Sequence, residues 1–122
     1  HPDTTSALNE LAASQAHQGK FDAAVANLEE CVRRRRQQLG PKHEQTLATE
    51  ISLAALLANA KRFEEAEQRL LGAAAAWGDD ADVPTAVRRR LFISLVRTYE
   101  VWGRPEAGQP WKAKADSLGP NR

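Results

Sequence analysis

The sequence predicts an all-α fold, an α-solenoid built from three antiparallel helix hairpins. Three observations predict it. Apolar residues recur at helical spacing, turn residues interrupt them at short intervals, and the chain resembles itself after a shift of 42 residues. Alanine is abundant, and no stretch shows the alternation typical of a strand. Hairpins of this size cannot bury their apolar faces alone, so neighbouring hairpins are expected to stack.

The first hairpin is expected over residues 4–18 and 21–38, with a break at Gly19. In its second helix, apolar residues follow Phe21 at spacings of three and seven, which places Ala24 and Leu28 on one face. Glycine and proline then form a turn before the next helix.

The second hairpin is expected over residues 44–60 and 63–77, and the third over 85–102 and 105–117. The stretch from Leu47 to Ala60 is apolar on more than one side, as in a helix packed between neighbours. The repeats would then cover approximately residues 1–40, 43–82 and 85–118 of a single domain, 1–122.

Several apolar residues recur 42 positions along the chain. Phe21 corresponds to Phe63, and Leu11 corresponds to both Leu53 and Leu95. The third copy departs in its second helix, where Pro105 takes the place of the aromatic residue.

In this register, the pattern from Leu11 to Cys31 resembles a tetratricopeptide repeat (TPR). The period of 42 and the L-G-P-x-H linker resemble the longer repeat of kinesin light chains and many bacterial proteins. Gln15 stands at a usual large apolar position, and Lys61 replaces the turn glycine. The signature positions implied by the resemblance are Leu11, Ala12, Gly19, Phe21, Ala24, Leu28, Cys31, Leu53, Ala54, Phe63, Ala66, Leu70, Ala73, Leu95, Tyr99 and Gly103.

The first residues, H-P-D-T, repeat the end of the linker, because His1 and Thr4 correspond to His43 and Thr46. We therefore expect the chain to be a fragment of a longer protein. The stretch from residue 99 to 114 also resembles the closing repeat of arrays that follow bacterial Ser/Thr kinase domains. This second resemblance implies a bacterial signalling protein.

Composition narrows the classes of function. The net charge of +1 gives no general attraction to nucleic acid or membrane, and no apolar run approaches the length of a membrane span. The single cysteine excludes an internal disulfide and fits a reducing cytosol, so a cytoplasmic location is expected.

The residues that could carry catalysis do not form a recognisable site. His43 and Glu44 begin a zinc-protease pattern, but Leu47 stands where the second histidine is required. Cys31 lies on the apolar stripe and is expected to be buried and unreactive. We therefore expect no enzyme activity, no catalytic or metal-binding residues, no cofactor and no small-molecule substrate.

Two arginine runs, 33–36 and 88–90, raise the alternative of nucleic-acid binding. Consecutive helical residues spread around the axis, so four arginines cannot form one stripe. Ion pairs Glu29–Arg33 and Glu30–Arg34 are also available at a spacing of four. Nucleic-acid binding is therefore the less favoured hypothesis. The three tryptophans, Trp77, Trp102 and Trp111, are expected to seal packing between repeats.

The TPR resemblance implies a concave groove lined by the first helix of each hairpin. Arg90 and Arg97 would favour an acidic partner segment, whereas Ile51 and Ala55 stand where chaperone-binding members carry lysine and asparagine. The leading hypothesis is a protein–protein interaction scaffold. One alternative is a structural role, in which the open face of the 4–18 helix forms a homodimer or extends a larger signalling protein. Another is that the groove positions are simply solvated and bind nothing. The implied groove positions are Ser6, Asn9, Ala13, His17, Ala48, Ile51, Ala55, Asn59, Arg90, Ile93, Arg97 and Val101.

Overall fold

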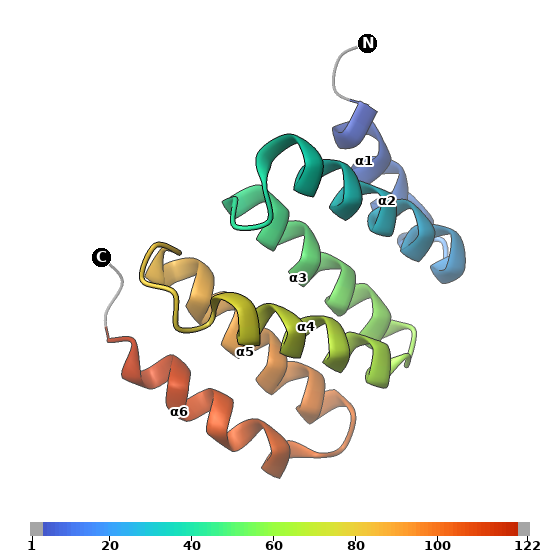
Figure 1. The fold of residues 1–122 in the computed structure, drawn as a ribbon. Helices are drawn as coiled ribbons and strands as arrows, with labels where there is room; N and C mark the ends of the chain where they lie inside the picture. Colours follow the sequence, from blue (N-terminus) through green and yellow to red (C-terminus); the bar gives the residue numbers. More distant parts are fainter. Residues whose placement is uncertain (1–3, 120–122) are drawn as a thin grey trace.

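A computed structural model describes residues 4–119 and confirms the all-α prediction: no strand occurs in this range. Successive helices run antiparallel and stack from one end of the molecule to the other (Figure 1). The elements are α1 (Thr4–His17), α2 (Phe21–Leu39), α3 (Glu44–Asn59), α4 (Phe63–Trp77), α5 (Thr85–Val101), the 3-10 helix η1 (Pro105–Gly108) and α6 (Gln109–Ser117).

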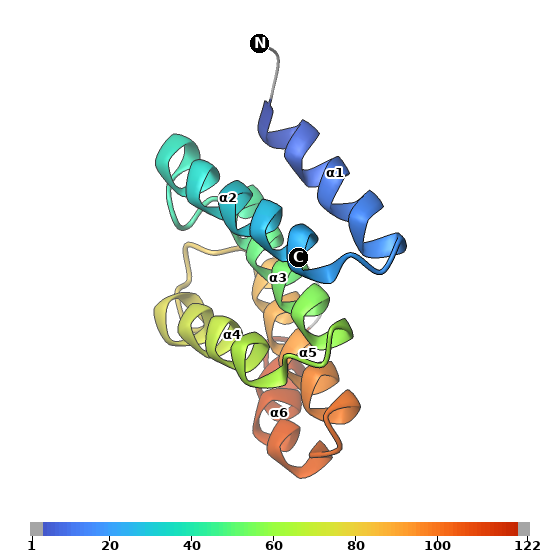
Figure 2. The same ribbon diagram turned by 90° about the vertical axis from the view of Figure 1, so that its right-hand side faces the viewer.

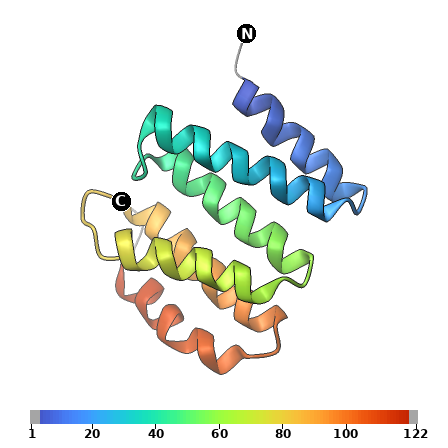
Figure 3. The same cartoon turned by 45° about the vertical axis from the view of Figure 1, so that its right-hand side comes forward.

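The helices form two layers. The first helices of the hairpins, α1, α3 and α5, lie on one side, and α2 and α4 lie on the other (Figures 2 and 3). Each helix packs on its neighbours in sequence, and α5 also packs on α3. One apolar core therefore continues from the first hairpin to the last, as expected for stacked repeats.

The three turns within the hairpins have the same backbone geometry. Gly19, Lys61 and Gly103 have φ angles of 79°, 64° and 81°, in the left-handed region. After each of them, the next backbone N–H donates to the carbonyl oxygen five residues earlier, at 2.8 Å in all three turns. This is the Schellman arrangement that ends helices, and Lys61 adopts it without being glycine.

The last hairpin differs from its prediction, because the expected helix 105–117 divides into η1 and α6. Pro110 lies in the first turn of α6 and has no N–H to continue a hydrogen-bond ladder from the preceding segment. Gly108 lies close to α5, where a Cβ atom would be 3.3 Å from the Cα atom of Val96. The break therefore lets this segment approach α5 closely.

The signature leucines differ in burial. Leu53 and Leu95 are 0% exposed, whereas Leu11 is 48% exposed. The preceding hairpin covers the first two, but in residues 4–119 no hairpin precedes α1 to cover Leu11. Leu11 therefore stands at a signature position of the repeat but is half-exposed within this range.

The polar residue at the apolar signature position is accommodated locally. Gln15 is partly buried, and its side-chain oxygen accepts a hydrogen bond from Asn27 of α2 at 2.8 Å. This bond joins the two helices of the first hairpin where an apolar contact would otherwise do so.

Candidate functional site

Two open hollows lie next to each other on the face formed by α1, α3 and α5. The larger hollow, of about 560 Å³, lies between α3 and α5, and the smaller, of about 360 Å³, is lined mainly by α1 and α3. Ala55 and Asn59 line both hollows, so the two form one continuous surface. The larger hollow is lined by Ile51, Ala55, Ala58, Asn59, Arg90, Ile93, Ser94, Arg97, Thr98 and Val101.

Most of the predicted groove positions meet at these hollows. Asn9 and Ala13 line the smaller hollow, whereas His17, at the end of α1, lines neither. The positions that line the larger hollow are Ile51, Ala55, Asn59, Arg90, Ile93, Arg97 and Val101.

Sequence reasoning missed three residues of the larger hollow: Ala58, Ser94 and Thr98. Each is adjacent in sequence to a predicted position, or one turn from one. The signal was available, because a helix that faces a hollow presents an arc wider than one residue per turn.

The larger hollow combines positive charge with apolar surface. Arg90 and Arg97 project from α5 and are exposed, and between them Ile93 is 39% exposed. Val101 follows one turn later and is 65% exposed. None of the lining residues is acidic, so the hollow suits an anionic group joined to an apolar one.

The smaller hollow is uncharged. Its polar side chains are Asn9, Ser52 and Asn59, and the others are alanine and leucine. An asparagine amide both donates and accepts, so this part of the surface can bond the N–H and C=O groups of a peptide backbone.

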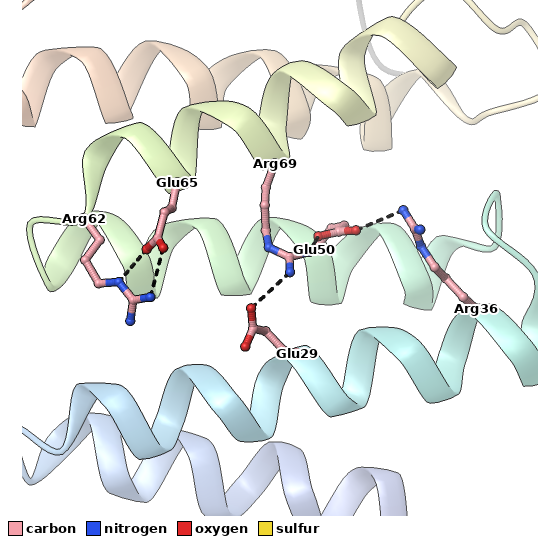
Figure 4. Close-up of polar contacts among 6 residues, drawn as sticks. All are labelled: Glu29, Arg36, Glu50, Arg62, Glu65 and Arg69. Carbon is pink, nitrogen blue, oxygen red and sulfur yellow. Dashed lines mark hydrogen bonds and ion pairs between the residues drawn. The ribbon is translucent and has the colours of Figure 1, made fainter.

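On the α2–α4 side, arginine side chains are held by carboxylates (Figure 4). Glu50 of α3 has a side chain only 6% exposed, and it accepts from Arg36 of α2 at 3.2 Å and from Arg69 of α4 at 2.9 Å. Arg69 also donates to Glu29 of α2 at 3.3 Å. The network joins three helices from two repeats.

The first arginine run is held by similar contacts. Arg34 donates to Glu30 at 2.9 Å, which confirms the expected pair. The expected Glu29–Arg33 pair is wrong, because Glu29 instead meets Arg69 and Arg33 shares Glu30 with Arg34. The two guanidinium groups lower the pKa of Glu30.

In the second run, Arg88 donates to the backbone oxygen of Val83 at 3.1 Å and Arg89 to that of Gly119. The two runs therefore do not form one unpaired cationic surface on the described part of the chain.

Cys31 is a core residue. It is 0% exposed, and its thiol donates to the backbone oxygen of Thr5 at 3.5 Å. Burial raises the pKa of the thiol, although Arg35 and Arg34 oppose that shift, so the thiol is protonated at neutral pH.

Residues 4–119 contain no cluster of histidine, cysteine and carboxylate side chains that could hold a metal ion. Within the same range, no helix has the length and apolar character needed to cross a bilayer.

The tryptophans belong to the packing of the second half. Trp102 stacks on Phe63, with ring centroids 5.6 Å apart, and so joins the third hairpin to the second. Trp111 of α6 stacks on Phe92 of α5 at 5.9 Å, and Trp77 is buried in the core. The three rings do not form a cage for a ligand.

Comparison with known structures agrees with this fold. A kinesin light chain from Podosopora anserina with nearly identical TPR-like repeats superposes with a TM-score of 0.85 at 23% identity. The match covers 97% of the present chain and 56% of that chain, so our chain spans little more than half its length. A variant of the same protein gives a TM-score of 0.84, also at 23% identity, with the same coverage.

A family model covers the larger part of the sequence. The tetratricopeptide repeat model matches residues 3–77, which include the first two hairpins. No curated protein sequence matches the chain. The family match, the turn geometry that recurs every 42 residues and the stacked hairpins agree with one another, and the chain belongs to the tetratricopeptide repeat family.

Proposed function

We propose that the chain is a protein-interaction module that binds a segment of a partner protein on its α1–α3–α5 face. The observation that carries the proposal is the continuous surface formed by the two hollows, which share Ala55 and Asn59. Tetratricopeptide repeats generally mediate protein–protein interactions, and stacked hairpins present extended surfaces suited to a peptide.

Selection of binders from a random peptide library displayed on phage tests the proposal. Replacing Ala55 by tryptophan fills the point where the hollows meet, and we expect selected peptides to lose binding to this variant. The control is Gln68→Trp, which adds the same bulk to an exposed position of α4 on the other side of the molecule. If no selected peptide responds to Ala55→Trp, the proposal fails.

A second candidate is a structural role, in which α1 forms a homodimer or extends a larger, cytoplasmic signalling protein. The exposure of Leu11, at 48%, favours it, because the equivalent Leu53 is fully covered. Light scattering coupled to size exclusion would give the mass of a dimer, and Leu11→Gln would reduce it to that of a monomer. Leu39→Gln is the control, since Leu39 is 40% exposed at the end of α2. A monomeric mass at all concentrations would contradict the homodimer.

A further inference from the structure

We propose that the partner segment is an acidic amphipathic helix that docks along α5. This inference rests on the proposed function and specifies its ligand. It concerns Arg90, Ile93, Arg97 and Val101, which lie on one side of α5 and line the larger hollow; we call them the α5 stripe.

The α5 stripe holds the arginines that the molecule itself does not pair. Residues 4–119 contain eleven arginines, and nine of them have a partner within the molecule. Their partners are carboxylates, hydroxyl groups and backbone oxygens, or, for Arg104, the ring of Trp102 at 4.0 Å. In this range Arg90 and Arg97 have no such partner. A guanidinium group gains most from a carboxylate, which it binds through two parallel hydrogen bonds.

Exposed apolar surface is concentrated on the same stripe. Four large apolar side chains are exposed in residues 4–119, and two of them, Ile93 and Val101, belong to the stripe. Charged and apolar side chains therefore alternate along α5, so a ligand must combine carboxylates with apolar side chains in the same order.

The spacing of the arginines indicates a helical ligand. Arg90 and Arg97 are seven residues apart on α5, which corresponds to about 10.5 Å at 1.5 Å per residue. A ligand helix aligned with α5 presents side chains seven residues apart on one face at this same distance. Positions three or four residues along fall between them on that face and would meet Ile93.

An extended ligand fits this spacing poorly. Residues on one face of a strand recur every second position, at about 6.6 or 13 Å, and neither distance matches the arginines. Residues three apart lie at about 10 Å but point to opposite faces. The α3 side of the hollow leaves room for a helix, because Ala55 and Ala58 are small.

Three synthetic peptides of equal composition test the inference by fluorescence anisotropy. The first is a helix-forming sequence with glutamates seven residues apart, one leucine between them and one beyond. The second moves one glutamate by two positions, which turns it about 200° around the axis. The third keeps the glutamate spacing but moves a proline from the end of the peptide to its centre, in exchange for a central residue, so that it cannot form a continuous helix. We expect the first to bind roughly tenfold more tightly than the others, with affinity falling as salt is added.

Charge reversal identifies the residues. We expect Arg90→Glu with Arg97→Glu to lose binding of the glutamate peptide and to gain binding of the same peptide with lysines in place of glutamates. Arg33→Glu is the control, because this side chain is 60% exposed on α2, away from the hollow. Circular dichroism checks that all variants fold. Replacing Arg90 and Arg97 removes no hydrogen bond or ion pair of the described structure, and Arg33→Glu removes one exposed pair with Glu30.

The outcomes separate this inference from the proposed function. Equal binding of the proline peptide, or of a peptide with glutamines in place of glutamates, overturns the acidic helix. Absence of binding by the first peptide at low salt overturns it too. If library peptides sensitive to Ala55→Trp are still found, the interaction module stands without this ligand; if none are found, both fail.

Discussion

The first and second repeats place equivalent residues in different surroundings. Leu11 and Leu53 are 42 positions apart on equivalent helices, yet Leu11 is 48% exposed and Leu53 is 0% exposed. Leu53 lies between two hairpins, whereas α1 has a hairpin on one side only within residues 4–119. The comparison teaches that the sequence of a repeat determines that it folds as a helix hairpin. The hairpins on either side determine how much each of its residues contributes to stability.

Truncation of the two leucines should give the largest difference between the repeats. We expect Leu53→Ala to lower the free energy of unfolding by roughly 3–5 kcal/mol, because it leaves a cavity in the core. Leu11→Ala should cost less than about 1 kcal/mol, because its side chain is half-exposed. Urea unfolding followed by circular dichroism measures both. Leu95→Ala is the control, since Leu95 is as buried as Leu53. Equal losses for Leu11 and Leu53 would contradict the comparison.

The third repeat extends the comparison at the position of Gln15, where it carries Tyr99. Its hydroxyl donates to Glu67 of α4 at 2.6 Å, and burial together with Glu67 raises the pKa of Tyr99 to about 12. The unfolded-state pKa is about 10, so this contribution to stability is present below pH 10 and is lost between about pH 10 and 12. We expect roughly 1–3 kcal/mol to be lost over that range.

Urea unfolding at several alkaline pH values measures this loss. Tyr99→Phe is the control, because it removes the ionisable hydroxyl and keeps the ring that stacks on Trp102. The variant should be less sensitive to alkaline pH than the parent protein. The same slope in both would show that other groups cause the loss.

The fold could be predicted because its signals are local and repeated. Apolar spacing and turn residues predicted most helix ends to within one residue, and the period of 42 predicted that Lys61 would stand at a turn built for glycine. The division of the last helix into η1 and α6 was not predicted. The third repeat was aligned with the first two, and the missing backbone N–H of Pro110, which marks the break, was not considered.

The candidate site was predicted only in part. The groove positions implied by the TPR resemblance include seven of the ten residues that line the larger hollow, and they omit Ala58, Ser94 and Thr98. The resemblance could not identify which arginines are unpaired. Arg69 meets Glu29 across 40 positions of sequence, and such partners depend on how α2 and α4 pack. Local spacing instead suggested the Glu29–Arg33 pair.

The first and second repeats also differ in a polar contact. In the second repeat Glu50 pairs with Arg36 and Arg69, whereas the equivalent residue of α1 is the apolar Leu8. We expect Glu50→Leu to cost about 1–2 kcal/mol in urea unfolding. The variant leaves Arg36 and Arg69 without their buried carboxylate, but both are partly exposed and can be hydrated. Glu64→Leu is the control, since Glu64 is an exposed carboxylate of α4. A gain in stability for Glu50→Leu would mean that desolvation of Glu50 outweighs its two ion pairs.

The smallest expected difference lies in the turns, where the first repeat has Gly19 and the second has Lys61. A non-glycine residue in the left-handed region costs roughly 1–2 kcal/mol, so Lys61→Gly should relieve strain. Glycine also increases the entropy of the unfolded chain, which offsets about half of that gain. We therefore expect Lys61→Gly to raise the free energy of unfolding by about 0.5–1 kcal/mol. Gly19→Lys should lower it by a similar amount, because a Cβ atom at Gly19 meets nothing within 4 Å and only the backbone is affected. A loss of stability for Lys61→Gly would mean that the lysine side chain contributes more than its backbone conformation costs.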